Sequence, residues 1–226
     1  MKLVIFDFCE TLVNFQTADC FSRFVLEKES RNFILKTDLL LDKMKFYKFC
    51  SKFNLDSWSQ KFFLLTNLNG LNKEKLESYA ELFLESKILP NLNEKVFEKF
   101  LNHLNANDFV IINSGGYQPY LDLFAKKYGV KKLFSTQFKY KGSIFTGEID
   151  GIDCLGQEKV RKMKEEGINF NNYAEIIVYS DSITDMPIFD LATTKVAIIN
   201  KNTIPSWCKK KFEIIKSKNI IQEVLS

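Results

Sequence analysis

Carboxylates stand directly after two apolar runs of the sequence. Asp7 follows the run Leu3–Phe6, and Asp181 follows the run at 176–180. Apolar runs of this kind are typical of buried strands in a parallel sheet, and the carboxyl ends of such strands meet at one edge. Two carboxylates brought together there repel each other unless a cation lies between them. The pattern favours a Mg²⁺ site, because Mg²⁺ prefers hard oxygen ligands and needs few of them from the protein.

Groups suited to binding phosphate lie between these two carboxylates in the sequence. A third apolar run, 109–113, ends on Ser114, Gly115 and Gly116, whose hydroxyl and backbone N–H groups can bind phosphate oxygens. Lys159 stands near the start of the predicted helix in GQEKVRKMKEEG and provides a compact positive charge. Each residue alone is explained as well by a polar strand end or a surface lysine. The ordered set indicates phosphate chemistry at one sheet edge.

Four buried strands are expected to position these groups. Short apolar runs bounded by polar residues indicate strands at 2–7, 109–114, 176–181 and 195–200. Between the second and third strands, the sequence FSTQFKYKGSIFTGEIDG is typical of a hairpin that turns at Lys141-Gly142. Strands that alternate with helical segments predict an α/β fold with a parallel sheet.

A long helical segment interrupts this alternation directly after the first strand. From about 18 to 86 the apolar spacing is helical, with Asp56, Asn72 and Asn93 as candidate N-caps of the helices that follow them. The sequence therefore predicts a Rossmann-like parallel sheet core with an inserted α-helical cap subdomain. We place the core at 1–14 and 90–226 and the cap at 15–89. An insert at this point would cover the carboxyl edge of the sheet as a lid.

The composition makes several classes of protein improbable. The 226 residues are 46% hydrophobic and 27% charged, a balance typical of a soluble globular protein. A net charge of +4 without clustering argues against a nucleic-acid partner, and no apolar run reaches 18 residues, which argues against a membrane partner. Five cysteines without a CxxC pair, and no recognisable signal peptide, favour a cytoplasmic location. We expect a monomer or a homodimer.

The chain resembles the haloacid dehalogenase superfamily, in particular its phosphoserine-phosphatase-like branch with a helical cap. The first motif of the family, Asp-x-Asp-x-Thr, corresponds to DFCET at 7–11, and the second corresponds to IINSGG, which contains Ser114. The third motif is a lysine and matches Lys159, while the fourth, an acidic pair, matches SDSITDMP at 180–187. These motifs occur in the family's order, and the resemblance spans nearly the whole chain.

The resemblance implies a phosphatase mechanism with an aspartyl-phosphate intermediate. Asp7 would be the nucleophile that attacks the phosphorus of a small phosphomonoester. Ser114, the amides of Gly115 and Gly116, and Lys159 would bind the transferring phosphoryl group.

The same resemblance assigns the metal ligands. Mg²⁺ would be held by Asp7, Asp181 and the backbone carbonyl of Cys9. Asp185 would complete this metal site by orienting either a metal-bound water or Lys159.

One departure from the family pattern concerns the general acid. The family has an aspartate at the position of Cys9, which protonates the leaving alcohol, and a thiol is a weaker donor. Glu10, the next residue, is an unusually large carboxylate for its position. We predict that Glu10 replaces the missing acid. The alternative is that Glu10 points to solvent and the protein is slow or inactive.

A second departure concerns the substrate. Phosphoserine phosphatases have a glutamate at the position of Gln16 that binds the substrate ammonium, and Gln16 is neutral. A phosphorylated alcohol, an amino alcohol or a sugar-linked group is therefore expected rather than phosphoserine. The main hypothesis is a Mg²⁺-dependent phosphatase. The alternatives are a phosphotransferase to an acceptor alcohol and a catalytically silent protein that binds a phosphate ligand.

Overall fold

The computed structural model describes residues 1–52, 59–200, 203–208 and 211–217. Its strands are β1 (Leu3–Phe6), β2 (Phe109–Tyr117), β3 (Lys132–Lys141), β4 (Ile144–Asp150), β5 (Ile176–Ser180), β6 (Thr194–Ile199) and β7 (Phe212–Lys216). Its α-helices are α1 (Thr17–Lys28), α2 (Asn32–Lys43), α3 (Phe46–Lys52), α4 (Gln60–Thr66), α5 (Lys73–Phe83), α6 (Glu94–Asn105), α7 (Gln118–Tyr128), α8 (Gln157–Glu165) and α9 (Met186–Phe189).

The strands form one seven-stranded sheet in the order β4-β3-β2-β1-β5-β6-β7. All neighbouring pairs are parallel except β3 and β4, which form the predicted antiparallel hairpin. β1 lies at the centre, where Leu3 pairs with Phe109 on one side and Ile176 on the other. The predicted α/β fold is confirmed. The edge strand β7 was not predicted, and β2 runs three residues beyond its predicted end at Ser114, to Tyr117.

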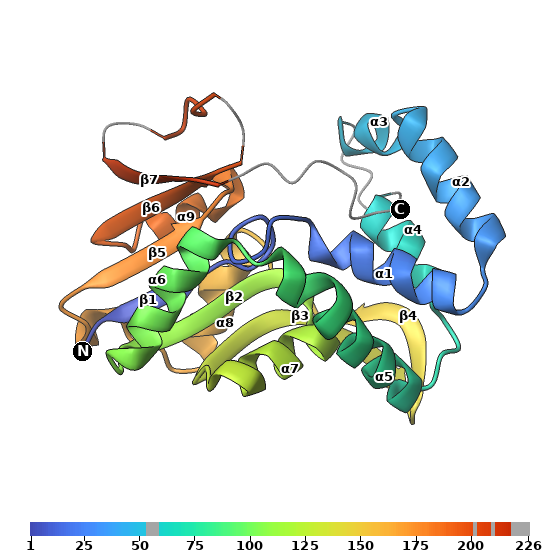
Figure 1. The fold of residues 1–226 in the computed structure, drawn as a ribbon, viewed down its shortest axis with the longest axis horizontal. Helices are drawn as coiled ribbons and strands as arrows, with labels where there is room; N and C mark the ends of the chain where they lie inside the picture. The colour runs from blue at the N-terminus through green and yellow to red at the C-terminus, as the bar shows by residue number, and fades with distance from the viewer. Residues whose placement is uncertain (53–58, 201–202, 209–210, 218–226) are drawn as a thin grey trace.

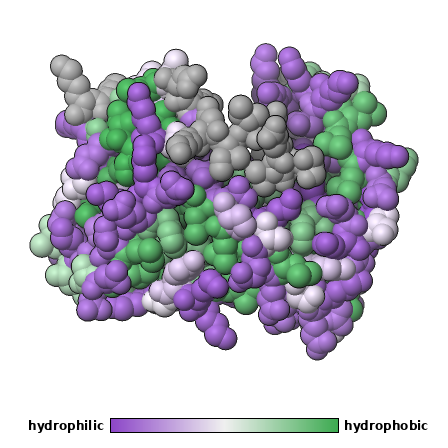
Figure 2. Space-filling model, in the orientation of Figure 1, coloured by the Kyte–Doolittle hydropathy of each residue, from purple (hydrophilic) through white to green (hydrophobic). Residues whose placement is uncertain are grey.

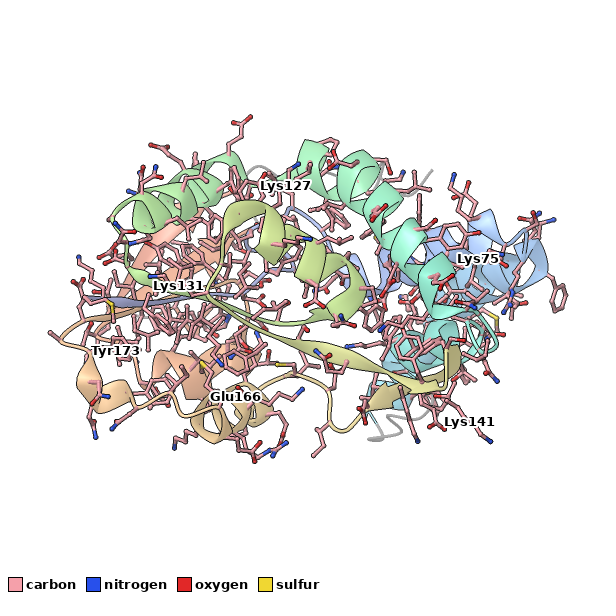
Figure 3. All side chains as sticks on the ribbon, turned by 90° about the horizontal axis from the view of Figure 1, so that it is seen from below. Lys75, Lys127, Lys131, Lys141, Glu166 and Tyr173 are labelled. Carbon is pink, nitrogen blue, oxygen red and sulfur yellow. The ribbon has the colours of Figure 1, made fainter. Side chains whose placement is uncertain are left out.

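The two faces of the sheet bury different side chains because alternate residues of a strand point to opposite faces. Val4 and Phe6 belong to one hydrophobic cluster, whereas Leu3 and Ile5 belong to another. Helices α6 and α7 cover the first face and α8 covers the second. Figure 3 shows this arrangement, with Lys127 at the end of α7 and Glu166 after α8 on opposite sides of the sheet.

Helices α1 to α5 and two short helical turns, Leu84–Ile88 and Leu89–Asn91, lie between β1 and α6. We call residues 17–91 the insert. Figure 1 shows that the carboxyl ends of the central strands point toward α1 to α4, which lie together at one end of the molecule. Residues that follow β1, β2 and β5 therefore face the insert.

The helix N-termini test the predicted caps. Asn72 is confirmed, because its side chain accepts a hydrogen bond from the Glu74 N–H at 2.9 Å. Asn93 precedes α6 as predicted, but its side chain makes no capping hydrogen bond. Asp56 lies outside the described residues. The helix predicted to follow it is described from Gln60 onward, with Ser59 accepting from the Phe62 N–H at 3.3 Å.

The insert is joined to the β3–β4 hairpin by backbone hydrogen bonds. The Gly70 N–H donates to the Phe145 carbonyl at 3.0 Å, and the Phe145 N–H donates to the Leu71 carbonyl at 2.8 Å. Nearby, Gly147 has φ +77°, and a Cβ atom at this position would lie 3.0 Å from the Thr66 carbonyl. Only glycine lets β4 approach the end of α4 this closely.

Polar and apolar residues alternate over the face of the molecule seen in Figure 2. Purple hydrophilic residues are spread over both the sheet and the insert, with green hydrophobic residues between them. In the described part of the chain, no helix has the length and apolar character needed to cross a membrane.

Candidate active site

A cavity of about 270 Å³ lies where the carboxyl ends of the central strands face the insert. All residues predicted for the site line it except Gly116: Asp7, Cys9, Glu10, Gln16, Ser114, Gly115, Lys159, Asp181 and Asp185. Asp7 and Asp181 directly follow β1 and β5, Ser114 lies three residues before the end of β2, and Lys159 comes from the first turn of α8. The parallel sheet thus brings together residues that are far apart in the sequence.

A buried ammonium group links two carboxylates at the base of this cavity. Lys159 Nζ donates to Asp7 Oδ1 at 2.9 Å and to Asp185 Oδ2 at 2.8 Å, and all three side chains are buried. The Ser180 hydroxyl also donates to Asp185 Oδ2, at 2.6 Å. Burial opposes the charge on Lys159, but the two carboxylates outweigh it and raise the pKa of the ammonium. Lys159 therefore stays charged, and Asp185 holds it against Asp7.

Asp7 and Asp181 face each other with too few donors between them. The Thr11 hydroxyl lies 3.5 Å from Asp7 Oδ2 and 3.3 Å from Asp181 Oδ1, and its single proton cannot serve both. Burial raises the pKa of Asp7, although Lys159 opposes the rise. Burial also raises the pKa of Asp181, to about 8, and the charges of Asp7 and Glu10 add to this effect. A cation between the two carboxylates would relieve this repulsion.

The donor set at this point fits Mg²⁺. Hard carboxylate oxygens of Asp7 and Asp181 suit it, and Mg²⁺ commonly binds through one or two carboxylates while keeping several waters. Among the described residues, no three His, Cys, Asp or Glu side chains are grouped to hold a metal, so a richer ligand shell is absent from that part of the chain. Asp185 uses Oδ2 for Lys159 and Ser180, while its buried Oδ1 has no hydrogen-bond partner among the described residues.

The last residues of β2 pair irregularly with β3, with a register shift between Asn113 and Tyr117, and we call residues 114–116 the turn at the end of β2. The Gly116 N–H donates to Ser114 Oγ at 3.2 Å, which leaves the Ser114 hydroxyl proton free to point elsewhere. A Cβ atom on Gly116 would lie 2.8 Å from the Tyr120 hydroxyl, so only glycine fits here without displacing Tyr120. Ser114 and Gly115 line the cavity, while Gly116 lies behind them and positions the hydroxyl.

Cys9 stands at the end of a chain of hydrogen bonds. The Tyr117 N–H donates to the Tyr120 hydroxyl at 2.8 Å, the Tyr120 hydroxyl lies 2.7 Å from the Thr17 hydroxyl, and Thr17 Oγ1 lies 2.9 Å from Cys9 Sγ. Each donor is satisfied if Tyr120 donates to Thr17 and Thr17 donates to the sulfur. The S–H proton is then free to point toward the cavity or toward Ser114 Oγ, 3.8 Å away. Burial raises the pKa of Cys9 to about 11, with help from the charge of Asp7, so the thiol keeps its proton at neutral pH.

Glu10 and Gln16 form a pair at the mouth of the cavity. Gln16 Nε2 donates to Glu10 Oε2 at 2.7 Å. Glu10 has φ +53°, and its backbone carbonyl accepts from Asn200 Nδ2 at 2.6 Å. This left-handed backbone is uncommon for a residue other than glycine, asparagine or aspartate. Glu10 lines the cavity beside Gln16, and the hydrogen bond between them is exposed to solvent.

Sequence reasoning missed two charged residues of the insert that also line the cavity, Asp19 and Lys61. Lys61 Nζ donates to the Asp153 carboxylate, with distances of 2.6 and 2.8 Å, and to the Gly115 carbonyl at 2.9 Å. Asp19 makes no hydrogen bond or ion pair within the described residues, and burial raises its pKa against the opposing charges of Arg23 and Lys61. Asp19 stands in the first turn of α1, where an acid is expected for helix stability alone, so no sequence signal marked it.

Comparisons with known proteins agree with this fold and site. The family model for haloacid dehalogenase-like hydrolases matches residues 4–190. A histidinol-phosphatase from Neisseria meningitidis is 23% identical over 93% of this chain and 96% of its own. A phosphoserine phosphatase from Methanocaldococcus jannaschii is 25% identical over 99% of this chain and 96% of its own.

Among solved structures, a protein of unknown function from Bordetella pertussis Tohama I has the same fold. It superposes with a TM-score of 0.77 at 21% identity, over 95% of this chain and 97% of its own. Because the family match covers most of the sequence, this chain belongs to the haloacid dehalogenase-like hydrolases. By its family it is a hydrolase, and the two curated relatives above are phosphatases.

Proposed function

We propose that this protein is a Mg²⁺-dependent phosphatase that hydrolyses a small phosphomonoester through an aspartyl-phosphate on Asp7. The observation that supports this most directly is the buried bridge from Lys159 to Asp7 and Asp185, beside Asp181 and Ser114. The bridge places an ammonium next to a carboxylate nucleophile at one end of a cavity. A charged phosphoryl group entering there would meet Lys159, the Ser114 hydroxyl and the backbone of Gly115.

The reaction proceeds in two steps that this chain's own groups support. A carboxylate oxygen of Asp7 forms a bond to phosphorus while the bond from phosphorus to the ester oxygen breaks, and the leaving alcohol takes up a proton. Water then attacks the phosphorus, releases inorganic phosphate and restores the Asp7 carboxylate. Lys159 holds Asp7 in place, and Asp185 holds Lys159.

Asp7, Asp181 and the Cys9 backbone carbonyl would hold Mg²⁺, which neutralises negative charge on the phosphoryl oxygens when bound. Asp185 orients Lys159 through Oδ2, and its Oδ1, unpartnered among the described residues, is free to orient a metal-bound water.

Two residues compete to protonate the leaving alcohol. Cys9 is buried, lines the cavity and has a free S–H proton in the arrangement described above. Glu10 also lines the cavity and keeps Oε1 without a hydrogen-bond partner in the described part of the chain. We retain Glu10 as the proposed donor because carboxyl groups are common general acids, with Cys9 as the competing assignment.

The charges around the rest of the cavity support an amino alcohol as the organic part of the substrate. Lys61 is neutralised by Asp153, whereas Glu10 and Asp19 have no cationic partner within hydrogen-bonding distance among the described residues. An ammonium group would compensate these two carboxylates, and a carboxylate on the substrate would be repelled by them. The names of both phosphatase relatives refer to amino-bearing alcohols, histidinol and serine.

A matched pair of substrates tests this proposal. O-phosphoethanolamine and propyl phosphate have similar size, but only the first carries an ammonium group. We expect the wild-type protein with Mg²⁺ to show a kcat/KM about tenfold higher for O-phosphoethanolamine, since a hydrogen bond to a charged group contributes on the order of 1.5–3 kcal/mol. Asp19→Asn should reduce this preference, whereas Glu81→Gln, at an exposed position of α5, should leave it unchanged.

Other outcomes separate the alternatives. Equal rates on both esters would contradict the amino alcohol, and phosphoserine as the better substrate would contradict exclusion of a carboxylate. Transfer of phosphate to an added alcohol, detected as a new ester, would identify a phosphotransferase. Binding of phosphate esters without any turnover would identify a catalytically silent protein.

A further inference from the structure

Lys61 reaches from the insert into the core, lines the cavity and contacts the turn at the end of β2 through the Gly115 carbonyl. It belongs to α4, and its contacts are Asp153, the Gly115 carbonyl and the face of the Tyr117 ring, whose centroid lies 5.2 Å from Nζ. The Lys61 and Asp153 side chains are about one quarter exposed, so this ion pair is partly shielded from solvent. Through these contacts, the ammonium group of Lys61 joins the insert to the turn at 114–116.

The Gly115 carbonyl depends on Lys61 as its donor. The Thr136 hydroxyl oxygen also lies 3.2 Å from that carbonyl, but it lies closer to Asp153 Oδ1, and its single proton cannot serve both. The Cys154 N–H donates to Thr136 Oγ1, which fixes the hydroxyl in place. Asp153 thus accepts from both Lys61 and Thr136, and the Lys61 ammonium is left to hold the carbonyl with a charge-assisted hydrogen bond.

Fixing this carbonyl also fixes the amide on the other side of the same peptide. The peptide bonds of the described chain are trans, so the Gly116 N–H points away from the Gly115 carbonyl. That N–H donates to Ser114 Oγ and so determines where the Ser114 hydroxyl proton can point. A glycine-glycine peptide has little steric restraint of its own and can rotate if the carbonyl is released.

We propose that Lys61 is a positioning residue that orients the phosphate-binding turn through the Gly115 carbonyl, with Asp153 holding the ammonium in place. The inference rests on the proposed function, because it assumes that Ser114 and the turn bind the phosphoryl group. Its consequence is that the insert contributes to binding the phosphate itself and does more than cover the alcohol. The phosphate site is complete only when α4 lies against the core.

Inorganic phosphate is the probe for this proposal, because it has no alcohol that Lys61 could contact. The dissociation constant of phosphate in the presence of Mg²⁺ is measured by calorimetry for the wild type, Lys61→Met and Lys61→Arg. We expect Lys61→Met to weaken phosphate binding about tenfold, as for loss of a charge-assisted hydrogen bond. Lys61→Arg should restore most of the affinity, since it can still donate to both Asp153 and the carbonyl.

Lys139→Met is the matched control. Lys139 forms an ion pair of similar length with Glu148, 2.7 Å, but both side chains are more than half exposed on the hairpin, away from the cavity. The control should leave the phosphate dissociation constant unchanged. Circular dichroism melting curves should show that all variants remain folded at the temperature of the measurement.

Asp153→Asn separates positioning from a simple effect of charge. If Lys61 acted only through its positive charge, removal of the nearby Asp153 charge would tighten phosphate binding. If Asp153 holds Lys61 on the carbonyl, Asp153→Asn should weaken phosphate binding several-fold, and the double variant with Lys61→Met should add little more. Tighter binding by Asp153→Asn, or unchanged binding by Lys61→Met, would overturn the inference.

Failure of the proposed function gives a different result. A wild-type protein that binds no phosphate at all would contradict the assignment of the turn itself, and the inference about Lys61 with it. A variant that loses activity on a phosphate ester but binds inorganic phosphate normally would place Lys61 in contact with the alcohol, which also contradicts a positioning role.

Discussion

The cavity has two sides that are built differently. The strand side consists of Asp7, Ser114, Lys159, Asp181 and Asp185, which follow the sheet strands or begin a core helix. The insert side consists of Glu10, Gln16, Asp19 and Lys61, which lie in the loop after β1 or in the insert. Four of the five strand-side residues are buried, all except Asp181, and Lys159 links Asp7 to Asp185, whereas the insert-side residues are partly exposed.

This difference indicates that the two sides of the cavity have different functions. Strand ends are held by hydrogen bonds on both sides of β1 and have little freedom to move, which suits groups that must meet a reacting phosphorus atom at fixed distances. Residues on surface helices and loops can change without disturbing the sheet, which suits recognition of different alcohols. The chemistry should therefore be lost by changes on the strand side and redirected by changes on the insert side.

The largest effect is expected on the strand side. Asp7→Asn removes the nucleophile and should lower kcat by about 10⁴-fold or more, as is typical when a covalent nucleophile is removed. Steady-state turnover of the best ester measures this loss. Asp190→Asn, which removes an exposed carboxylate paired with Lys195 at 3.5 Å, is the control and should keep full activity. A fully active Asp7→Asn variant would exclude Asp7 as the nucleophile.

A smaller effect is expected where the two sides meet, at Cys9 and Glu10. If Glu10 is the general acid, Glu10→Gln should lower kcat/KM for an alkyl phosphate by about 10²-fold, because an alkoxide is a poor leaving group without a proton. An aryl phosphate releases a phenolate that needs little protonation, so its rate should fall far less. Kinetics with one alkyl and one aryl ester measure the difference.

Cys9→Ser is the companion variant and should be mild on both esters. A large loss confined to the alkyl ester in Cys9→Ser would move the general acid to the thiol. Equal losses on both esters in Glu10→Gln would indicate a role in binding or folding.

The affinity for Mg²⁺ should rise with pH because the metal and a proton compete for the same carboxylate. The pKa of Asp181 is raised to about 8 without metal. Asp181 is therefore protonated in most molecules at pH 6 and in about half of them at pH 8. For one site of this pKa, the apparent association constant should increase about 50-fold between pH 6 and pH 8. Mg²⁺ titrations at several pH values measure this slope, and Asp181→Asn should remove most of it.

The smallest effect should appear on the side of the insert, as a change in stability. Gly147→Ala places a Cβ atom 3.0 Å from the Thr66 carbonyl at a φ of +77°. Gly151 is the matched control, because it has φ +75° but open space around its Cβ position. Both variants should suffer the left-handed backbone penalty of about 1–2 kcal/mol, and Gly147→Ala should lose about 1–3 kcal/mol more from overpacking. Equal free energies of unfolding, from denaturant titrations, would show that α4 does not press on β4.

The strand side could be predicted from the sequence because short apolar runs mark buried strands, and parallel topology brings their ends together. We could place Asp7, Ser114 and Asp181 at one edge of the sheet without knowing any contact between residues distant in the sequence. Lys61 could not be found this way, because its partners Asp153 and Gly115 lie 92 and 54 residues away and no periodicity links them. Helical spacing predicts which face of α4 is buried, but not which part of the core that face will meet.

Glu10 was predicted to replace the missing general acid, and this role stays a prediction. The structure places Glu10 on the cavity wall. Its hydrogen bond to Gln16 was not predicted, because it depends on a left-handed backbone at Glu10 that the sequence gives no reason to expect. β7 was missed because it is a short edge strand with mostly exposed side chains, so it lacks the apolar run of a buried strand.

The hydrogen bonds between the insert and the β3–β4 hairpin limit how this protein can be recombined with others. An insert joined to the core only through its two chain connections could be exchanged as a single continuous segment. Here the stretch Gly70–Lys73 forms backbone hydrogen bonds with Ser143 and Phe145 of the hairpin. Gly147, which has no side chain, leaves room for the end of α4. A working chimera would need residues 132–150 from the same donor as the insert, so two separate gene segments would have to be inherited together.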